Sequence, residues 1–284
     1  MNFFRKLDRR GGATVTQLRL APIGILATLL LATLSFSWVQ VSGAAKKAVN
    51  MGNTRTPVLI ELFTSEGCST CPPADALLEK LDESQPVSAA ELIVLSEHVD
   101  YWNNIGWKDP YSSSEFSERQ RDYSERFGRG SVYTPQMVVD GHLEFVGGDE
   151  QRAIRAIENA AKVQKIAVAL SSIHRQANNT ITLHVEVGPL RSNATQSGNV
   201  LIAIADDSDE SHVSRGENAG RTLRHVAVLR SLIPVGTVDG VREFSRDVTV
   251  KDGKWNSRSL RIVAIVQEMS GGRVWGLASA RLSN

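Results

Sequence analysis

The stretch PVLIELFTSEGCSTCPPADALLEKL, residues 57–81, contains three different local patterns in a row. Residues 57–63 form an apolar run of strand-favouring residues, which predicts a buried β-strand. From residue 74 to residue 81 the apolar side chains recur at helical spacing, so a helix is expected there. We therefore expect a strand, a loop that carries Cys68 and Cys71, and a helix, in that order.

Cys68 and Cys71 are the only cysteines among the 284 residues, and they form a C-x-x-C motif. Two cysteines placed at random in a chain of this length would rarely fall three positions apart, so the spacing indicates a function. A local structural disulfide is the alternative, but closing so short a loop removes little entropy from the unfolded chain. A cysteine attacks as its thiolate, which the free N–H groups of a helix N-terminus stabilise. The motif thus predicts a redox centre in which Cys68 is the nucleophile and Cys71 the resolving thiol.

The first 45 residues have the pattern of an export signal. A basic segment occupies the first 20 positions, and an apolar stretch follows over residues 20–41. Small residues at positions 42–45 suit cleavage by a signal peptidase, whereas the apolar stretch is also long enough for an uncleaved membrane anchor. We expect an exported protein, periplasmic or secreted, or one tethered to the inner membrane by this segment. Disulfides are stable in such compartments.

The segment from residue 91 to residue 165 continues with alternating strands and helices. Residues 91–99 predict a second strand, and a charged helix is expected over residues 114–127, after an aromatic and polar segment. Asp140 and Gly141 lie between two short apolar runs, which is a strong signal for a β-hairpin. Asp149 is placed to cap a helix over residues 150–165. The expected order up to residue 165 is β-α-β-α-β-β-α.

Beyond residue 165 the pattern changes to short strands. Seven β-like runs, separated by Gly, Asn, Ser or Asp, occur at residues 168–173, 180–187, 200–205, 222–229, 241–250, 260–267 and 274–278. This spacing is typical of a β-sandwich. The expected fold class is therefore an α/β domain over residues 55–165, with a helical insertion at 100–130, followed by an all-β, sandwich-like domain over residues 166–284.

These patterns resemble the thioredoxin superfamily, which implies that residues 55–165 form a thioredoxin-like domain. The stretches LFTSEGCSTCPPAD, HVDYWNNIGWKDP and RGENAGRTLRHV are similar to an exported thioredoxin-like family known as domain of unknown function 1223. That family lends no established substrate. The chain also departs from thioredoxin: Ser69 and Thr70 replace its Gly-Pro between the cysteines, and Leu62 occupies the position of its buried acid. Glu61 is one residue away and should face the other side of the strand.

The resemblance also implies a substrate-docking position. Thr134-Pro135 resembles the superfamily's cis-proline, whose preceding residue offers its backbone to an extended substrate; a plain turn proline is the alternative. Glu66, near the first cysteine, is a candidate modulator. Arg215 and Arg221 are two more, because we expect the polar stretch 206–220 to be ordered and to pack over the cysteines, where an arginine would favour the thiolate. A solvated loop is the alternative reading of that stretch.

Two other functions are compatible with the sequence. The first is a copper or zinc site, in which two histidines join the two cysteines as ligands; the candidate ligands are Cys68, Cys71, His98 and His142. The second is a binding module without enzymatic activity.

The formal net charge of the chain is +1, with acids and bases interspersed, and this argues against binding of nucleic acid. Our main expectation is an exported thiol–disulfide oxidoreductase that needs no cofactor. Its partners would be protein thiols or disulfides, or small thiols.

Overall fold

The computed structural model describes residues 55–176, 180–189, 197–239, 242–251, 259–269 and 271–283. The expected signal peptide or anchor, residues 1–45, lies outside these ranges. Within them, no helix is both long enough and apolar enough to span a bilayer.

The strand, cysteine loop and helix expected at the start of the described chain are present. Strand β1 (Thr56–Thr64) leads into the loop, and helix α1 (Pro72–Ser84) begins directly after the second cysteine. Strand β2 (Ala90–His98) then pairs with β1 in parallel, with Ile60 opposite Val94. The apolar run of β1 is buried on both faces, as expected for a central strand with helices on both sides.

The next segment forms a helix, a hairpin and a second helix. Helix α2 (Ser114–Arg126) is followed by strands β3 (Gln136–Val139) and β4 (Leu143–Val146) and by helix α3 (Glu150–Ala160). The hairpin turn has positive φ angles of 52° at Asp140 and 61° at Gly141, which is the backbone that an Asp-Gly pair favours. The Asp149 side chain accepts a hydrogen bond from the N–H of Arg152 and so caps α3, as expected.

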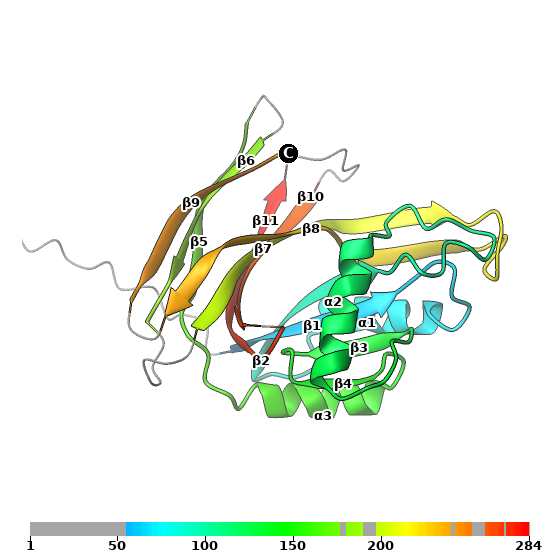
Figure 1. Ribbon diagram of the computed structural model, residues 1–284, viewed down its shortest axis with the longest axis horizontal. Helices are drawn as coiled ribbons and strands as arrows, with labels where there is room; N and C mark the ends of the chain where they lie inside the picture. The colour runs from blue at the N-terminus through cyan, green and yellow to red at the C-terminus, as the bar shows by residue number, and fades with distance from the viewer. Residues whose placement is uncertain are drawn as a thin grey trace, which may run out of the picture. The chain divides into compact units, whose positions relative to one another are not determined.

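All seven strands expected in the C-terminal part are present, and two of them are much longer than expected. They are β5 (Val168–Gln176), β6 (Thr180–Val187), β7 (Ser197–His212), β8 (Thr222–Asp239), β9 (Phe244–Lys251), β10 (Ser259–Glu268) and β11 (Val274–Ser283). Strands β7 and β8 pair antiparallel along almost their whole length. They form a long two-stranded ribbon, in which β8 contacts α1 (Figure 1).

The expected fold class is wrong, because strands from both parts of the chain form one sheet. Eight strands pair in the order β11-β10-β7-β8-β2-β1-β3-β4, and the described chain is mostly β-structure with three helices. The join is the parallel pairing of β2 with β8 at Ser96 and Val228. An α/β thioredoxin-like domain followed by a separate β domain would have placed these strands in different sheets. The sequence showed where strands lie but not which strands pair.

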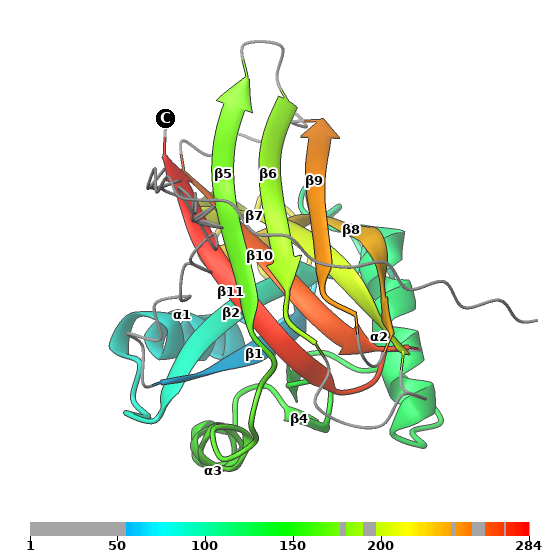
Figure 2. The same cartoon turned by 90° about the vertical axis from the view of Figure 1, so that its left-hand side faces the viewer.

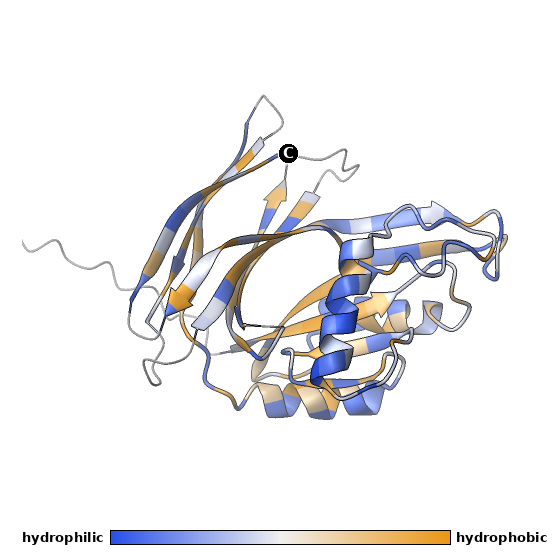
Figure 3. Ribbon diagram, viewed as in Figure 1, coloured by the Kyte–Doolittle hydropathy of each residue, from blue (hydrophilic) through white to orange (hydrophobic). Residues whose placement is uncertain are grey.

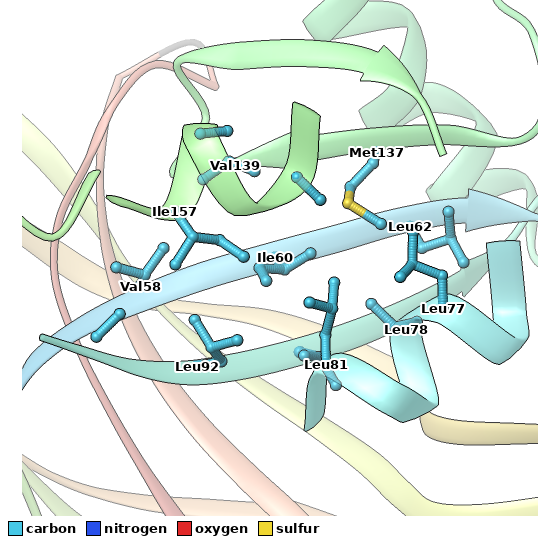
Figure 4. Packing of buried hydrophobic residues seen from close by; sticks show 14 of the residues in the cluster. Val58, Ile60, Leu62, Leu77, Leu78, Leu81, Leu92, Met137, Val139 and Ile157 are labelled. Atoms are coloured by element: carbon cyan, nitrogen blue, oxygen red, sulfur yellow. The ribbon is translucent and has the colours of Figure 1, made fainter. Parts of the chain in front are cut away.

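Helices cover both faces of the N-terminal half of the sheet. On one face, Val58, Ile60 and Leu62 of β1 pack with the apolar side chains of α1 and α3 (Figure 4). On the other face, Leu59 packs with Phe116 of α2 and with side chains of the C-terminal strands. Helix α2 is otherwise strongly hydrophilic (Figure 3), so it buries only a narrow stripe.

A second layer covers the C-terminal half of the sheet. Strands β5, β6 and β9 form a separate three-stranded sheet that lies across the strands of the large one (Figure 2). Alternate residues of β6, such as Ile181 and Leu183, face alternate residues of the large sheet, such as Ile202 and Ile262. This part therefore has the two-layer packing expected of a sandwich, although one of its layers continues into the N-terminal half.

A buried ion pair ties α1 to the C-terminal strands. The guanidinium of Arg261, on β10, donates two hydrogen bonds of 2.8 Å to the two carboxylate oxygens of Asp82, near the end of α1. It also donates to Asp207 on β7 at 2.8 Å. Arg261 is only 5% exposed, so these two carboxylates, rather than water, stabilise its positive charge.

We predict that Arg261→Ala lowers the free energy of unfolding by about 3 kcal/mol, because it leaves two carboxylates without their buried partner. Urea denaturation of both proteins measures the difference. Lys80→Ala is the matched control, since Lys80 pairs with Glu150 on the surface, where a pair contributes about 1 kcal/mol at most. Equal losses in the two variants would contradict the structural role of Arg261.

Candidate functional site

The two cysteines form a disulfide at the start of α1. Their Cα atoms are 5.4 Å apart, and neither residue is exposed to solvent, although Ser69 and Thr70 between them are exposed. The loop is held by backbone hydrogen bonds from the N–H of Cys68 to Ser65 and from the N–H of Cys71 to Cys68. The chain therefore presents an oxidised C-x-x-C motif in an ordered loop.

The first turn of α1 has no free N–H group to offer a thiolate. Its first two residues, Pro72 and Pro73, have no N–H at all. The next two N–H groups, of Ala74 and Asp75, both donate to the carbonyl oxygen of Cys71. The stabilisation that we expected from free helix N–H groups is therefore largely missing. The dipole of the helix remains, and the Thr70 hydroxyl lies 3.4 Å from the Cys68 sulfur.

The bond between Thr134 and Pro135 is cis, as expected. A Cβ atom built on Gly147 would lie 3.2 Å from both Pro135 and Ala74, so this proline and the first turn of α1 flank the same glycine. The indole N–H of Trp102 donates to the Thr134 hydroxyl at 2.9 Å, and its Cβ lies 3.1 Å from where a Gly67 Cβ would be. Trp102 thus connects the cis bond with the cysteine loop.

The polar stretch 206–220 is ordered and packs against the cysteine loop, as expected, but its first seven residues are the end of β7 rather than part of a loop. Its tip holds the loop directly. The buried side-chain amide of Asn218 donates to the carbonyl oxygens of Glu66 and Cys68, at 2.8 and 3.0 Å. The carboxylate of Glu217 accepts a hydrogen bond of 3.0 Å from the N–H of Ser69. We call residues 213–221 the ribbon tip.

Neither arginine of the ribbon tip acts as we expected. Arg215 and Arg221 are both exposed. The guanidinium of Arg221 donates to the side-chain oxygen of Asn218 at 2.9 Å, which orients the amide toward the cysteine loop. The ribbon tip therefore contacts the loop through an amide and a carboxylate rather than through a cation.

Glu66 is completely buried and has several partners from distant parts of the chain. Its carboxylate accepts a hydrogen bond of 2.7 Å from the indole N–H of Trp107 and another from the hydroxyl of Ser211 on β7. His225 of β8 lies 3.3 Å away through its Nε2 atom. This candidate modulator is thus part of a network that joins the cysteine loop to the ribbon.

A second buried pair adjoins this network. Nδ1 of His98, at the end of β2, lies 2.7 Å from the carboxylate of Asp109, which also accepts the N–H of Glu66 at 2.8 Å. Burial alone would raise the pKa of Asp109, but the charge and hydrogen bond of His98 lower it, with help from two backbone N–H groups. The rings of His98 and His225 are 4.6 Å apart, and Tyr111 contacts both.

His225 carries a positive charge at neutral pH. Burial lowers its pKa, but Asp75, 3.8 Å from Nδ1, and Glu66 outweigh that effect and raise the pKa to about 10. Asp75 lies in the first turn of α1, and Glu66 lies two residues before Cys68. One imidazolium is therefore placed between carboxylates on both sides of the C-x-x-C segment.

Glu61 lies on the opposite face of β1, as strand alternation predicted. Its carboxylate accepts a hydrogen bond from Arg119 of α2 at 2.7 Å and one from the Tyr123 hydroxyl at 2.6 Å. Burial raises the pKa of the neighbouring Glu97 well above its ordinary value. This second buried cluster belongs to the α2 side of the sheet.

The two histidines of the metal hypothesis lie in different environments. His98 is buried beside Asp109, whereas His142 is exposed in the β3–β4 turn, with Arg273 at 3.3 Å. Among the residues that the structure describes, no three His, Cys, Asp or Glu side chains are grouped so that they could hold a metal ion. The geometry therefore gives no support to a site formed by these four residues.

Sequence reasoning missed three residues that complete the cluster: Asp75, Asp109 and His225. All three fall within the three stretches on which the family resemblance rests, 62–75, 98–110 and 215–226. These stretches are far apart in the chain but meet at the cysteine loop. That shared resemblance was the one signal that pointed to them.

Comparison of the chain with known protein families gives a match. The family model described as "Protein of unknown function (DUF1223)" matches residues 59–267, which confirms the resemblance to that family. No curated protein matches the chain.

Two solved structures share the fold. The protein AGR_C_4864 from Agrobacterium tumefaciens is 24% identical, with a TM-score of 0.60 over 80% of this chain and 95% of that one. HBP35 of Porphyromonas gingivalis is 12% identical, with a TM-score of 0.59 over 80% of this chain and 76% of that one. The family model covers most of the length of this chain. This chain therefore belongs to the DUF1223 family of proteins of unknown function.

Proposed function

We propose that this protein is a thiol–disulfide oxidoreductase that uses Cys68 and Cys71 as its redox pair. The observation that carries the proposal is the disulfide within a C-x-x-C motif, at the start of a helix and beside a cluster of buried charged side chains. Buried charges cost free energy, so they are commonly found where they adjust the reactivity of a neighbouring group. We further propose that the protein acts after export, where disulfides persist.

A purely structural disulfide explains the arrangement less well. The bond closes a loop of four residues, which constrains the unfolded chain very little. The same loop is already held by its own backbone hydrogen bonds and by two more from Asn218. A covalent bond adds little to this order, so its presence is better explained by chemistry.

The reaction that we propose transfers two electrons from the substrate thiols to the disulfide. A substrate thiolate attacks Cys68, the disulfide breaks, and the electron pair leaves on the sulfur of Cys71. A second substrate thiolate then attacks the mixed disulfide and releases Cys68 as a thiolate. The substrate is oxidised to a disulfide, and the protons of its two thiols pass to water or to the protein. The reverse sequence reduces a substrate disulfide.

A groove of about 400 Å³ lies beside the redox pair. It begins at Pro72, next to the second cysteine, and runs between α1 and the start of β8. Asp75 and Glu79 line one side, and Arg221 and Arg224 line the other. Charged groups of both signs in a groove of this size suit a small polar thiol or part of a peptide.

We predict that reduced Cys71→Ser protein accumulates a mixed disulfide when it is incubated with oxidised glutathione. The adduct persists because the resolving thiol is missing, whereas the wild-type protein closes its own disulfide and releases the adduct. Intact-protein mass spectrometry measures both products. The Cys68→Ser protein is the matched control and should form the adduct at least tenfold more slowly, since Cys71 is the resolving thiol. Equal rates in the two variants, or no adduct in either, would refute this assignment.

We also predict that Asn218→Ala makes the disulfide easier to reduce. The substitution removes the two hydrogen bonds by which the ribbon tip holds the cysteine loop, so the buried sulfurs become accessible more often. The rate of reduction by dithiothreitol should rise several-fold under native conditions, as followed by thiol titration. Asn159→Ala, in the exposed part of α3, should leave the rate unchanged. An unchanged rate in Asn218→Ala would show that the tip does not limit access.

A further inference from the structure

The redox pair lacks the usual source of positive charge. Free N–H groups at a helix N-terminus stabilise a thiolate, but α1 begins with two prolines and its next two N–H groups donate to Cys71. The arginines of the ribbon tip are exposed, and Arg221 is engaged with Asn218. The helix dipole and the Thr70 hydroxyl, 3.4 Å from the Cys68 sulfur, are the stabilising groups within the loop itself. A cation from another part of the chain would add to them.

His225 is a cation that contacts residues on both sides of the cysteine loop. It is 3% exposed, and β8 brings it to the cysteine loop from more than 150 positions away in sequence. Its Nε2 atom lies 3.3 Å from Glu66, and its Nδ1 atom lies 3.8 Å from Asp75. Those two partners flank the C-x-x-C segment in the sequence, two residues before Cys68 and four residues after Cys71, so the imidazolium contacts the chain on both sides of the redox pair.

Groups from every neighbouring element face His225. They are Glu66 of the cysteine loop, Asp75 of α1, His98 of β2, Tyr111 of the segment after β2, and Asp209, its cross-strand partner on β7. The carboxylates among them outnumber the cations. Without the imidazolium, this buried region would be strongly negative, and a thiolate in the adjoining loop would be disfavoured.

We propose that His225 is a positioning residue of the redox site: its imidazolium, held between Glu66 and Asp75, stabilises the thiolate of Cys68 in the reduced protein. The inference rests on the proposed function and adds a residue that the C-x-x-C motif does not contain. It also gives the two buried carboxylates a role, since they keep the imidazole protonated and in place. The strength of the effect depends on charge rather than on contact with the sulfur.

The test uses the Cys71→Ser protein, in which Cys68 is the only thiol. The pKa of that thiol is obtained from the rate of alkylation by iodoacetamide between pH 4 and pH 9. Adding His225→Gln should raise this pKa, because it removes a unit positive charge from the cluster beside the cysteine loop. At an effective dielectric constant of about 20, a unit charge roughly 10 Å away shifts a pKa on the order of one unit. Alkylation at pH 5 should then be about tenfold slower.

Glu66→Gln provides the decisive comparison, because its expected effect has the opposite sign. It removes a negative charge from the same cluster while Asp75 still faces the imidazolium at 3.8 Å and keeps it charged, so it should lower the pKa of the Cys68 thiol. Damage to the fold would move both variants in the same direction. His184→Gln is the matched control: His184 also contacts a carboxylate, of Asp247, but it lies on the separate three-stranded sheet and should leave the pKa unchanged.

The outcomes separate this inference from the proposed function. Opposite shifts in the His225 and Glu66 variants support the inference, and an unchanged pKa in His225→Gln, or shifts of the same sign, overturns it. If His225→Gln does not fold, the Glu66→Gln result still decides, since a raised or unchanged pKa there contradicts the charge argument. If the Cys71→Ser protein forms no mixed disulfide with oxidised glutathione, the proposed function itself fails.

Discussion

The antiparallel pairing of β7 with β8 is the interaction on which the rest of this structure depends. One end of this pair lies in the sandwich-like part, where β7 and β10 bury a shared apolar core against β6. Farther along, the buried Val228 of β8 pairs with Ser96 of β2, and beyond this position the two strands extend as a ribbon. Because the two strands support each other along their length, the polar end stays ordered without a core of its own.

The ribbon also determines the chemistry of the cysteine loop. Ser211 and His225 lie on its two strands, and Asn218 lies at its tip, so three contacts to the loop come from one rigid element. Residues held on paired strands are placed more precisely than residues of a free loop. A segment that looks like a long polar loop in the sequence therefore provides most of the surroundings of the disulfide.

The buried charges around the loop form a mutually dependent set. The Glu66 carboxylate has three partners, Trp107, Ser211 and His225, and all three are distant from it in the sequence. Removing one charge leaves another buried without compensation, which is costly, so such clusters constrain the sequence strongly. This explains in physical terms why the three stretches that carry the family resemblance are the ones that meet here.

The sequence by itself determined the local elements and the reacting pair. Apolar periodicity located β1, α1 and the C-terminal strands, the Asp140-Gly141 pair located the hairpin, and the C-x-x-C spacing identified the cysteines. These features depend on residues close together in the chain, and for that reason a pattern reveals them.

Only the tertiary structure decided that the two halves share one sheet and that His225 and Asn218 belong to the site. Pairing between strands that are distant in the sequence is set by backbone hydrogen bonds and by burial of whole faces, and no local pattern of residues records which two strands will meet. The charge of His225 likewise depends on two carboxylates that the fold brings within 4 Å of it, one on each side of the cysteines. A histidine in a strand has no such charge until its neighbours are known.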